Sequence, residues 1–350
     1  MKRFGYVLML LFVLLFRIPC SAAEEEVKEK KFDVVEYIFY YINDSHEWHF
    51  LSIGETEVAI PLPIILYSEH TGWHFFSSHQ LYKEEKDETF PFSIKREGVN
   101  REQIIEKLPD GTEFIPLDLS ITKTVLGVII VALILLLFFI PGSRKTIKSP
   151  MAVPKKTQNI IEPMVIFVQD IARDFAGEKY NRYMPYLLTI FSFVLVANFV
   201  GLILPLELGI TSNISVTFVL AAFTFIITTV SGNKHYWMHI INPPVPIYMK
   251  IPIPLSPFIE FLGIFIKPVV LMIRLFANML AGHMIVTVLI GLIFLMSSIF
   301  HPLVGAGTSV ISLVFSVFMV VVDILVAFIQ AYIFTLLSAM YFGMATEKGH

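Results

Sequence analysis

Three apolar runs in the middle of the chain are long enough to be membrane-crossing helices. The first, residues 121–140, matches the ~20 apolar residues that a bilayer-spanning helix requires. The second and third lie at about 185–204 and 216–230. Basic residues follow the first run: Arg144, Lys145, Lys148, Lys155 and Lys156. Because an excess of Lys and Arg marks cytoplasmic loops, the chain before the first run is expected outside the cytoplasm.

Two further apolar stretches, 254–300 and 303–346, are far longer than one crossing needs. A helix of about 45 residues would reach ~65–70 Å, over twice the ~30 Å hydrocarbon thickness. Each stretch either splits into two crossings or forms one long, strongly tilted helix. No polar turn marks a split, and five crossings take an external N-terminus to a cytoplasmic C-terminus. We therefore expect an all-α integral membrane protein with about five crossing helices, the last two long and strongly tilted.

Residues 157–179 have a two-sided pattern that is typical of a helix lying at a membrane surface. The polar side carries Asp170, Arg173, Asp174, Glu178 and Lys179. We expect this amphipathic helix on the cytoplasmic surface.

The chain before the first crossing is predicted to have two segments. Residues 1–23 have the basic start, apolar core and small-residue end of a secretory signal peptide. A retained helix is the alternative, but the apolar run is short and three glutamates follow it at once. Residues 24–117 would then be an extracytoplasmic domain, and residues 118–350 the transmembrane domain.

Short β-favouring runs predict that residues 24–117 form a small β-rich domain. They lie at 58–66, 73–76 and 90–94, with turn residues between them. Fragments 45–50 and 70–75 resemble each other, which suggests two similar halves. Five histidines lie here, and structural roles are favoured over metal binding because no regular ligand spacing accompanies them. They are His46, His49, His70, His74 and His79.

The composition agrees with a membrane protein and excludes other classes. Of 350 residues, 55% are hydrophobic and 16% charged, whereas soluble domains average about 45–50% and about 25%. The formal net charge of −3 does not predict a nucleic-acid partner. Cys20 is the sole cysteine, which excludes a disulfide framework or thiolate cluster. The sequence has no Gly-rich phosphate loop, so we expect no nucleotide site in this chain. We also expect no cofactor and no metal.

A few polar side chains interrupt the long apolar stretches. A guanidinium at bilayer depth costs ~2.5–3.5 kcal/mol on insertion scales, and Arg274 cannot escape this by losing its proton. Glu260 and Lys267 precede it at intervals of seven, so the three share one helix side. Asn278 lies four positions further on the same side, whereas His283 faces another direction.

Asp323 and Gln330, in the last stretch, are also seven apart and share one face. A structural ion pair between Arg274 and Asp323 would satisfy both charges. Such a pair does not need the neighbouring His283 or Gln330. Intramembrane ionisable groups in a row more often mark an ion or proton route.

Residues 273–283, Ile-Arg-Leu-Phe-Ala-Asn-Met-Leu-Ala-Gly-His, resemble the signature of subunit a of F-type ATP synthases. Gln330 and the aromatic-rich C-terminal end resemble the last helix of that family. The resemblance covers about residues 118–350, including Asp118 and Asn198. It implies two long tilted helices curved against a rotating ring of c subunits.

The resemblance also implies a role for each polar residue. Arg274 would face the carboxylate of each passing c subunit, separate two offset proton half-channels and block direct leakage between them. His283 and Asp323 would relay protons in the outer half-channel, since imidazole titrates near ~6.5. The other positions would be polar neighbours of the arginine, Asn278 and Gln330, or line the inner mouth, Glu260 and Lys267.

On this resemblance the chain is a non-catalytic stator subunit that couples proton flow to ring rotation and ATP synthesis. Its implied partners are the c-ring, subunit b of the peripheral stalk, other ATP synthase subunits and membrane lipid. Its implied location is the bacterial inner membrane, with a cytoplasmic C-terminus. Gly201 and Asn213 stand where some relatives carry acids, and residues 24–117 are outside the common family core.

Two other function classes remain as alternatives. An intramembrane hydrolase would use His283 and Asp323 as metal ligands or acid/base groups, but no His-Glu-x-x-His or Gly-x-Ser-x-Gly motif supports it. A secondary ion transporter would bind an anion at Arg274, but it predicts inverted repeats, and the sequence shows no such symmetry.

Overall fold

The fold was analysed in a computed structural model. It describes residues 44–53, 56–82, 90–94, 103–108, 112–148, 157–203, 208–241, 255–299 and 302–347. The chain divides into two compact units, Met1–Asp33 and Val34–His350, and all described residues belong to the second. The predicted signal peptide and Cys20 lie outside the described residues.

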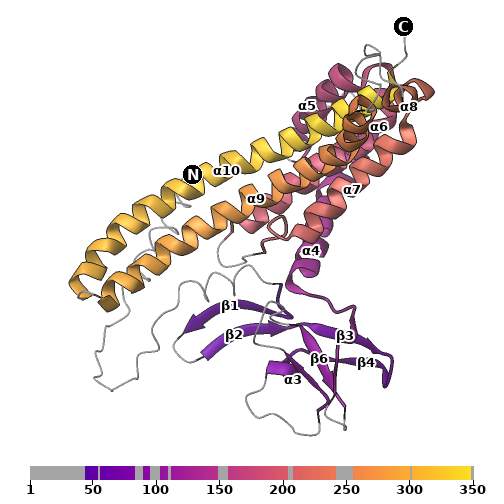
Figure 1. Cartoon of the computed structure of the whole chain (residues 1–350). Helices are drawn as coiled ribbons and strands as arrows, with labels where there is room; N and C mark the ends of the chain where they lie inside the picture. Colours follow the sequence, from indigo (N-terminus) through magenta and orange to yellow (C-terminus); the bar gives the residue numbers. More distant parts are fainter. Residues whose placement is uncertain are drawn as a thin grey trace. The chain divides into compact units, whose positions relative to one another are not determined.

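Short antiparallel strands form the N-terminal region (Figure 1). They are β1 (Glu47–Ile53), β2 (Thr56–Pro61), β3 (Pro63–Ser68), β4 (Gly72–Ser77), β5 (Phe92–Ile94), β6 (Ile104–Lys107), β7 (Glu113–Phe114) and β8 (Leu117–Asp118). Strands β1 and β2 form a hairpin, and the other sheets have the orders β4-β3-β8 and β5-β6-β7. A short helix, α3 (His79–Tyr82), follows β4. The predicted β-rich region is confirmed.

Alternate residues of β3 build a small core in this region. Ile64 and Leu66 are buried and pack with Phe92 of β5 and Ile104 of β6. This alternation is expected of an antiparallel sheet with one buried face. The turn before β4 ends at Gly72, whose φ of +83° favours glycine.

Two details of the sequence prediction are wrong here. The run 58–66 is not one strand, because β2 ends at Pro61 and β3 begins at Pro63 in a different sheet. Proline has no N–H for the ladder, so the two prolines separate the strands. The resembling fragments lie in β1 and at β4, the first strand of one hairpin and the second of another. They therefore do not mark two equivalent halves.

The rest of the described chain is mainly helical. The helices are α4 (Lys123–Lys148), α5 (Gln158–Ala176), α6 (Tyr180–Gly201), α7 (Ile214–Ser231), α8 (Lys234–Ile241), α9 (Leu255–Ile299) and α10 (Pro302–Thr346). Among the described residues, five helices are long and apolar enough to cross a membrane: α4, α6, α7, α9 and α10. This confirms the predicted membrane fold.

Helices α9 and α10 contain 45 residues each and are not split. They run side by side, and α9 continues through Pro268 without ending (Figure 1). The alternative of four shorter crossings is therefore wrong. The tilt of these helices in a membrane stays a prediction.

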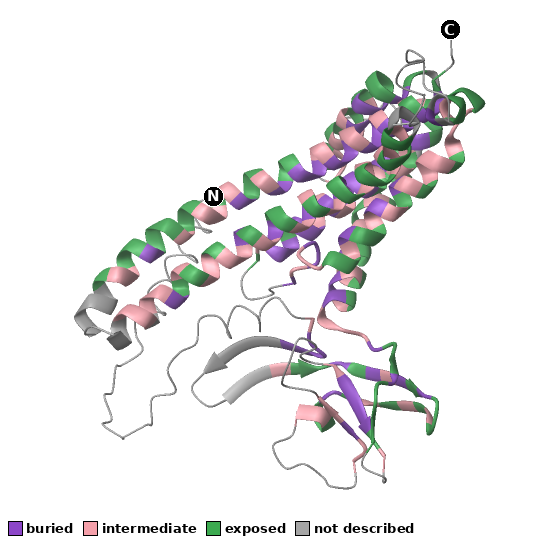
Figure 2. Cartoon of the chain, in the orientation of Figure 1, coloured by how far each residue is buried: buried purple, intermediate pink, exposed green. Residues whose placement is uncertain are grey.

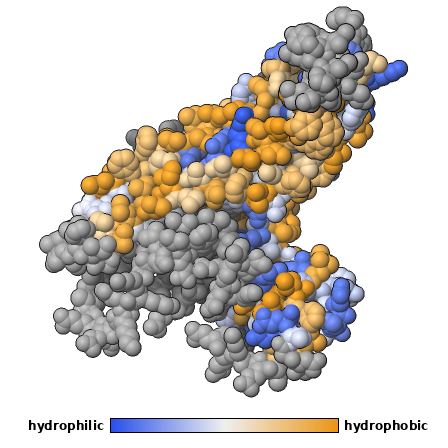
Figure 3. All heavy atoms as spheres, viewed as in Figure 1, coloured by the Kyte–Doolittle hydropathy of each residue, from blue (hydrophilic) through white to orange (hydrophobic). Residues whose placement is uncertain are grey.

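The helical core lies where the C-terminal half of α10 meets α5, α6 and α9 (Figure 2). Phe334 and Phe342 of α10 are buried there with Phe191 of α6 and Leu271 and Leu275 of α9. The same helix is largely exposed nearer its start, with large apolar side chains at Val310, Ile311, Leu313, Val314, Phe315, Val317 and Phe318. Apolar residues dominate the visible helical surface (Figure 3), as a lipid or membrane-protein contact requires.

Helix α5 is amphipathic, as predicted. Its buried residues Val168, Ile171 and Ala172 belong to the helical core, while Arg173 and Asp174 are exposed. Its position at the cytoplasmic surface stays a prediction.

Candidate functional site

The stripe predicted on the first long helix lies on one unbroken helix, α9. Glu260, Lys267 and Arg274 are all half-buried, and Asn278 is exposed. Seven residues make nearly two helical turns, so these side chains follow one side of α9. The predicted grouping of charges along one stripe is therefore present in the fold.

Arg274 does not pair with Asp323 in this fold. Both side chains are described, and no ion pair within 4.0 Å joins them, whereas His46 and Asp118 in the β-rich region do form one, at 2.8 Å. The structural ion-pair alternative therefore finds no support among the described residues.

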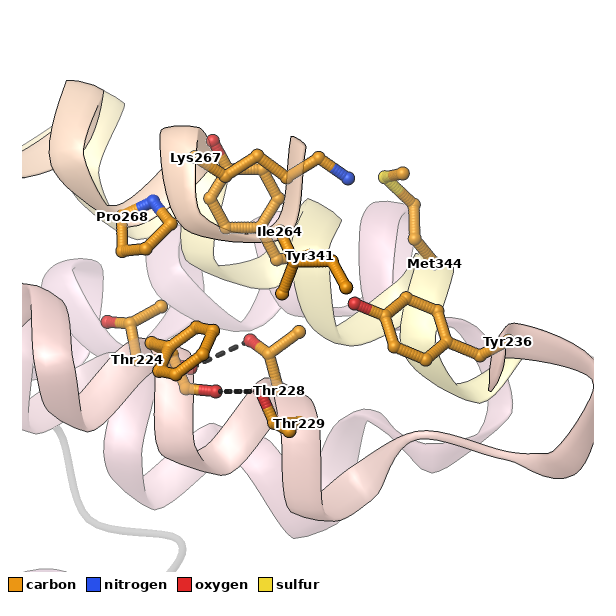
Figure 4. A pocket seen from close by; sticks show the side chains of 10 residues that line it. Thr224, Thr228, Thr229, Tyr236, Ile264, Lys267, Pro268, Tyr341 and Met344 are labelled. Carbon is orange, nitrogen blue, oxygen red and sulfur yellow. Dashed lines mark hydrogen bonds between the residues drawn. The ribbon is translucent and has the colours of Figure 1, made fainter. Parts of the chain in front are cut away.

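Lys267 lies beside a small cavity between α7, α8, α9 and α10 (Figure 4). Its Nζ is 5.6 Å from the ring centroid of Tyr341, a cation–π distance. The Tyr236 hydroxyl points into the cavity from α8, and Lys267 lies above it in the view. Burial and then the negative charge of Glu260 raise the pKa of Tyr236. Lys267, Tyr236 and Tyr341 therefore line one cavity.

A hydrogen-bonded link fixes this end of the bundle. Asn233, between α7 and α8, donates its backbone N–H to the Ala345 carbonyl at 2.9 Å and its Nδ2 to the Thr346 carbonyl at 2.8 Å. These carbonyls belong to the last turn of α10, where helical partners are missing. The link holds α8, and so Tyr236, close to the end of α10.

The two residues of the predicted proton relay, His283 and Asp323, each lie against a glycine. A Cβ on Gly201 of α6 would be 3.6 Å from His283 Nε2, and a Cβ on Gly282 would be 2.7 Å from Asp323 Oδ1. The Asp323 carboxylate therefore reaches α9 one residue before His283. His283 Nε2 is buried and has no hydrogen-bond partner among the described residues.

Gln330 shares the buried face of α10 with Asp323, as their spacing predicts. Gln330 is 4% exposed and Asp323 is 9% exposed, and Ala327 between them is fully buried. Burying a polar side chain costs free energy unless it is hydrogen-bonded. The face therefore carries polar groups into the interior of the bundle.

Asn198 of α6 is a further buried polar residue near the contact of Gly201 with His283. It is fully buried, and its Oδ1 accepts a hydrogen bond from Thr211 Oγ1 at 2.7 Å. Its Nδ2 has no partner among the described residues. Asn198 and Gly201 are three residues apart, so they face the same side of α6.

Sequence reasoning missed Tyr236, Tyr341 and Thr211. The two tyrosines are ordinary aromatic residues in the sequence, and Thr211 lies in a short link between two crossings. Their spacing carries no periodic signal. Only the packing of distant helices brings them to the charged stripe and to Asn198.

Comparison with known proteins covers both parts of the chain. Residues 125–343 match the family model "ATP synthase A chain". Residues 37–119 match a separate family, described as a domain of unknown function, DUF8433. The β-rich region thus matches a different family model from the helices.

Several curated relatives are named ATP synthase subunit a. The one from Chlorobium phaeobacteroides is 43% identical over 236 residues, 65% of this chain and 66% of that protein. The one from Chloroherpeton thalassium is 41% identical over 65% of this chain and 67% of that protein. The Myxococcus xanthus relative is 40% identical over 67% of this chain and 75% of that protein. The match thus spans about two thirds of the length of the first two relatives.

The family match covers most of the chain and includes the crossing helices and the charged stripe of α9. The chain is a multi-pass membrane protein that belongs to the ATP synthase A chain family.

Proposed function

We propose that this chain is the stator channel subunit of a rotary F-type ATP synthase. It provides two proton half-channels to a ring of c subunits and couples proton flow to rotation and ATP synthesis. Its further partners are subunit b of the peripheral stalk and membrane lipid. It lies in the bacterial inner membrane, with residues 24–117 extracytoplasmic and the C-terminus cytoplasmic.

The observation that carries this proposal is the position of Arg274. It is half-buried near the middle of a 45-residue apolar helix, and it makes no ion pair with Asp323 of its own chain. Because the guanidinium stays charged at any working pH, it needs a negative counter-charge in a medium of low dielectric. A carboxylate on a neighbouring membrane subunit supplies that charge when it passes.

The polar groups on either side of Arg274 divide into two sets. Glu260 and Lys267, with Tyr236 and Tyr341, line the inner half-channel. His283 and Asp323 belong to the outer half-channel. The two sets lie on opposite sides of Arg274 along α9, so a proton passes between them only by riding on the ring.

Rotation is needed because each proton carries little free energy. One charge crossing 100 mV releases ~2.3 kcal/mol, so ATP synthesis needs several protons. A ring that turns past a fixed arginine adds these steps together.

Arg274→Ala tests the proposal in inverted membrane vesicles that contain the whole ATP synthase. We expect the complex to assemble but ATP-driven acidification of the vesicles to be abolished, because nothing then holds the ring carboxylate ionised. Arg173→Ala, at an exposed arginine of α5, is the matched control and should pump normally. Normal pumping by Arg274→Ala would refute the proposal.

A further inference from the structure

One contact between the β-rich region and the helical bundle is made by an acidic residue, Asp44, which lies just before β1. Asp44 Oδ1 accepts hydrogen bonds from the Thr124 backbone N–H at 3.1 Å and from Thr124 Oγ1 at 2.9 Å. Asn213 Nδ2 donates to Asp44 Oδ2 at 3.5 Å and to Thr124 Oγ1 at 3.3 Å. The carboxylate therefore joins the start of α4 to the start of α7.

Packing beside Asp44 holds it in place. The backbone N–H of Lys123 donates to the Ser45 carbonyl at 3.0 Å. Trp48 of β1 is buried in a cluster with Val131 of α4, Ala197 of α6 and Ile210 of the α6–α7 link. An aromatic anchor of this size fixes the adjacent chain. Asp44 is thus positioned on the helices by apolar packing.

A row of polar groups leads from Asp44 toward His283. Asn213 lies two residues after Thr211, and Thr211 is hydrogen-bonded to the buried Asn198. Asn198 shares one side of α6 with Gly201, and Gly201 lies against His283. The buried Asn198 Nδ2 and His283 Nε2 have no partner in the described part of the chain. Buried polar atoms of this kind call for an explanation, and a water-filled path is one.

We propose that Asp44 is the entrance carboxylate of the outer half-channel, and that residues 37–119 serve to hold it there. This rests on the function proposed above. At this end of the path, Asn213 and Gly201 cannot exchange a proton, whereas Asp44 can. Asp44 takes a proton from external water and becomes neutral. It then passes the proton through water along Asn213, Thr211 and Asn198 to the His283 imidazole, and returns to a carboxylate.

Three other charged or titratable residues adjoin the Asp44 contact along the chain or on α4. Lys123 begins α4 beside the Asp44 contact. His46 and Glu47 follow Asp44 in the chain, and His46 is paired with Asp118.

A plainer role for Asp44 is to cap α4. A carboxylate that accepts from the first N–H groups of a helix is stabilising without any proton transfer. Asparagine caps helices about as well as aspartate but cannot carry a proton. Asp44→Asn therefore separates the two roles.

The experiment measures ATP-driven proton flow through the whole ATP synthase in inverted vesicles. Asp44 is changed to Asn, Ala or Glu. If Asp44 carries protons, Asp44→Asn and Asp44→Ala both lower the rate of proton flow several-fold, whereas Asp44→Glu keeps most of it. If Asp44 only caps α4, Asp44→Asn pumps protons at the wild-type rate and Asp44→Ala alone is impaired. The second result would overturn the inference. Asp174→Asn, at an exposed acid of α5, is the matched control.

A double variant keeps the test valid should Asp44→Asn assemble poorly. Asp44→Asn combined with Asn213→Asp moves the carboxylate across the 3.5 Å hydrogen bond. Asn213 Oδ1 accepts from the Ser215 N–H at the start of α7, and aspartate fills this role equally well. Restored flow supports the relay, and flow no higher than in Asp44→Ala overturns it. If Arg274→Ala abolishes ATP-driven acidification but Asp44→Asn does not lower it, only this inference fails.

Discussion

Arg274, Lys267 and Glu260 show how one helix holds several charges in an apolar setting. Lys267 lies over the Tyr341 ring at 5.6 Å. All three side chains are half-buried, and long charged side chains can pack their carbon stems against apolar neighbours. Each charge is thereby held on one side of α9 without a fixed partner at Asp323.

The pair His283 and Asp323 gives a prediction on proton flow. Replacing both by Leu should block flow, because neither an imidazole nor a carboxylate then remains beside α9. Replacing only one should leave partial flow, since the other can still exchange a proton. Passive proton flow driven by a diffusion potential measures this. Full conduction in the double variant would remove both residues from the path.

The pair His46 and Asp118 gives a prediction on acid stability. Burial raises the pKa of Asp118, but hydrogen bonds from His46 and Ser120 outweigh it, and the net pKa is lowered. A lowered pKa adds stability that is fully present above the unfolded value, about 3.9, and is lost as pH falls through the folded pKa. The protection of β8 and its neighbour β3 from hydrogen exchange, relative to the intrinsic exchange rate at the same pH, should therefore fall below about pH 4.

Asp118→Asn is the variant that checks this. It removes the titrating group, so exchange should be faster at neutral pH and change less in acid. An unchanged acid profile would show that another group controls it.

At the scale of helices, glycine decides how closely α10 approaches α5. A Cβ on Gly343 would overlap the Phe175 carbonyl oxygen at the end of α5. A backbone atom cannot move aside as a flexible side chain can. Gly343→Ala should therefore destabilise the bundle by about 1–3 kcal/mol, the usual cost of overpacking.

Gly307→Ala on the same helix is the control, because a Cβ there meets nothing within 4 Å. It should be neutral or slightly stabilising, since alanine favours helix. Thermal unfolding of the purified complex compares the two. Equal unfolding temperatures would contradict the close approach at Gly343.

The sequence predicted the helices better than their contacts. Apolar run length and parity predicted α9 and α10 as single helices, because these depend on the chain alone. Spacing by seven placed Glu260, Lys267 and Arg274 together for the same reason. The contacts of His283 with Gly201 and of Asp323 with Gly282 depend on how separate helices pack, so no local pattern could predict them.

In the whole molecule, two regions that match different family models meet at polar and aromatic residues. The helices belong to the ATP synthase A chain family, and the β-rich region matches a domain of unknown function. Asp44 and Trp48 lie in the second and contact the first. Sequence comparison within the first family alone could not have found them.

The most direct test of the central claim is a structure of the assembled ATP synthase with its ring present. The quantity to measure is the distance from the Arg274 guanidinium to the nearest carboxylate. We expect that carboxylate to belong to a ring subunit, within about 4 Å in at least one rotary position. Arg274 bound to Asp323 in every rotary position would contradict the proposal.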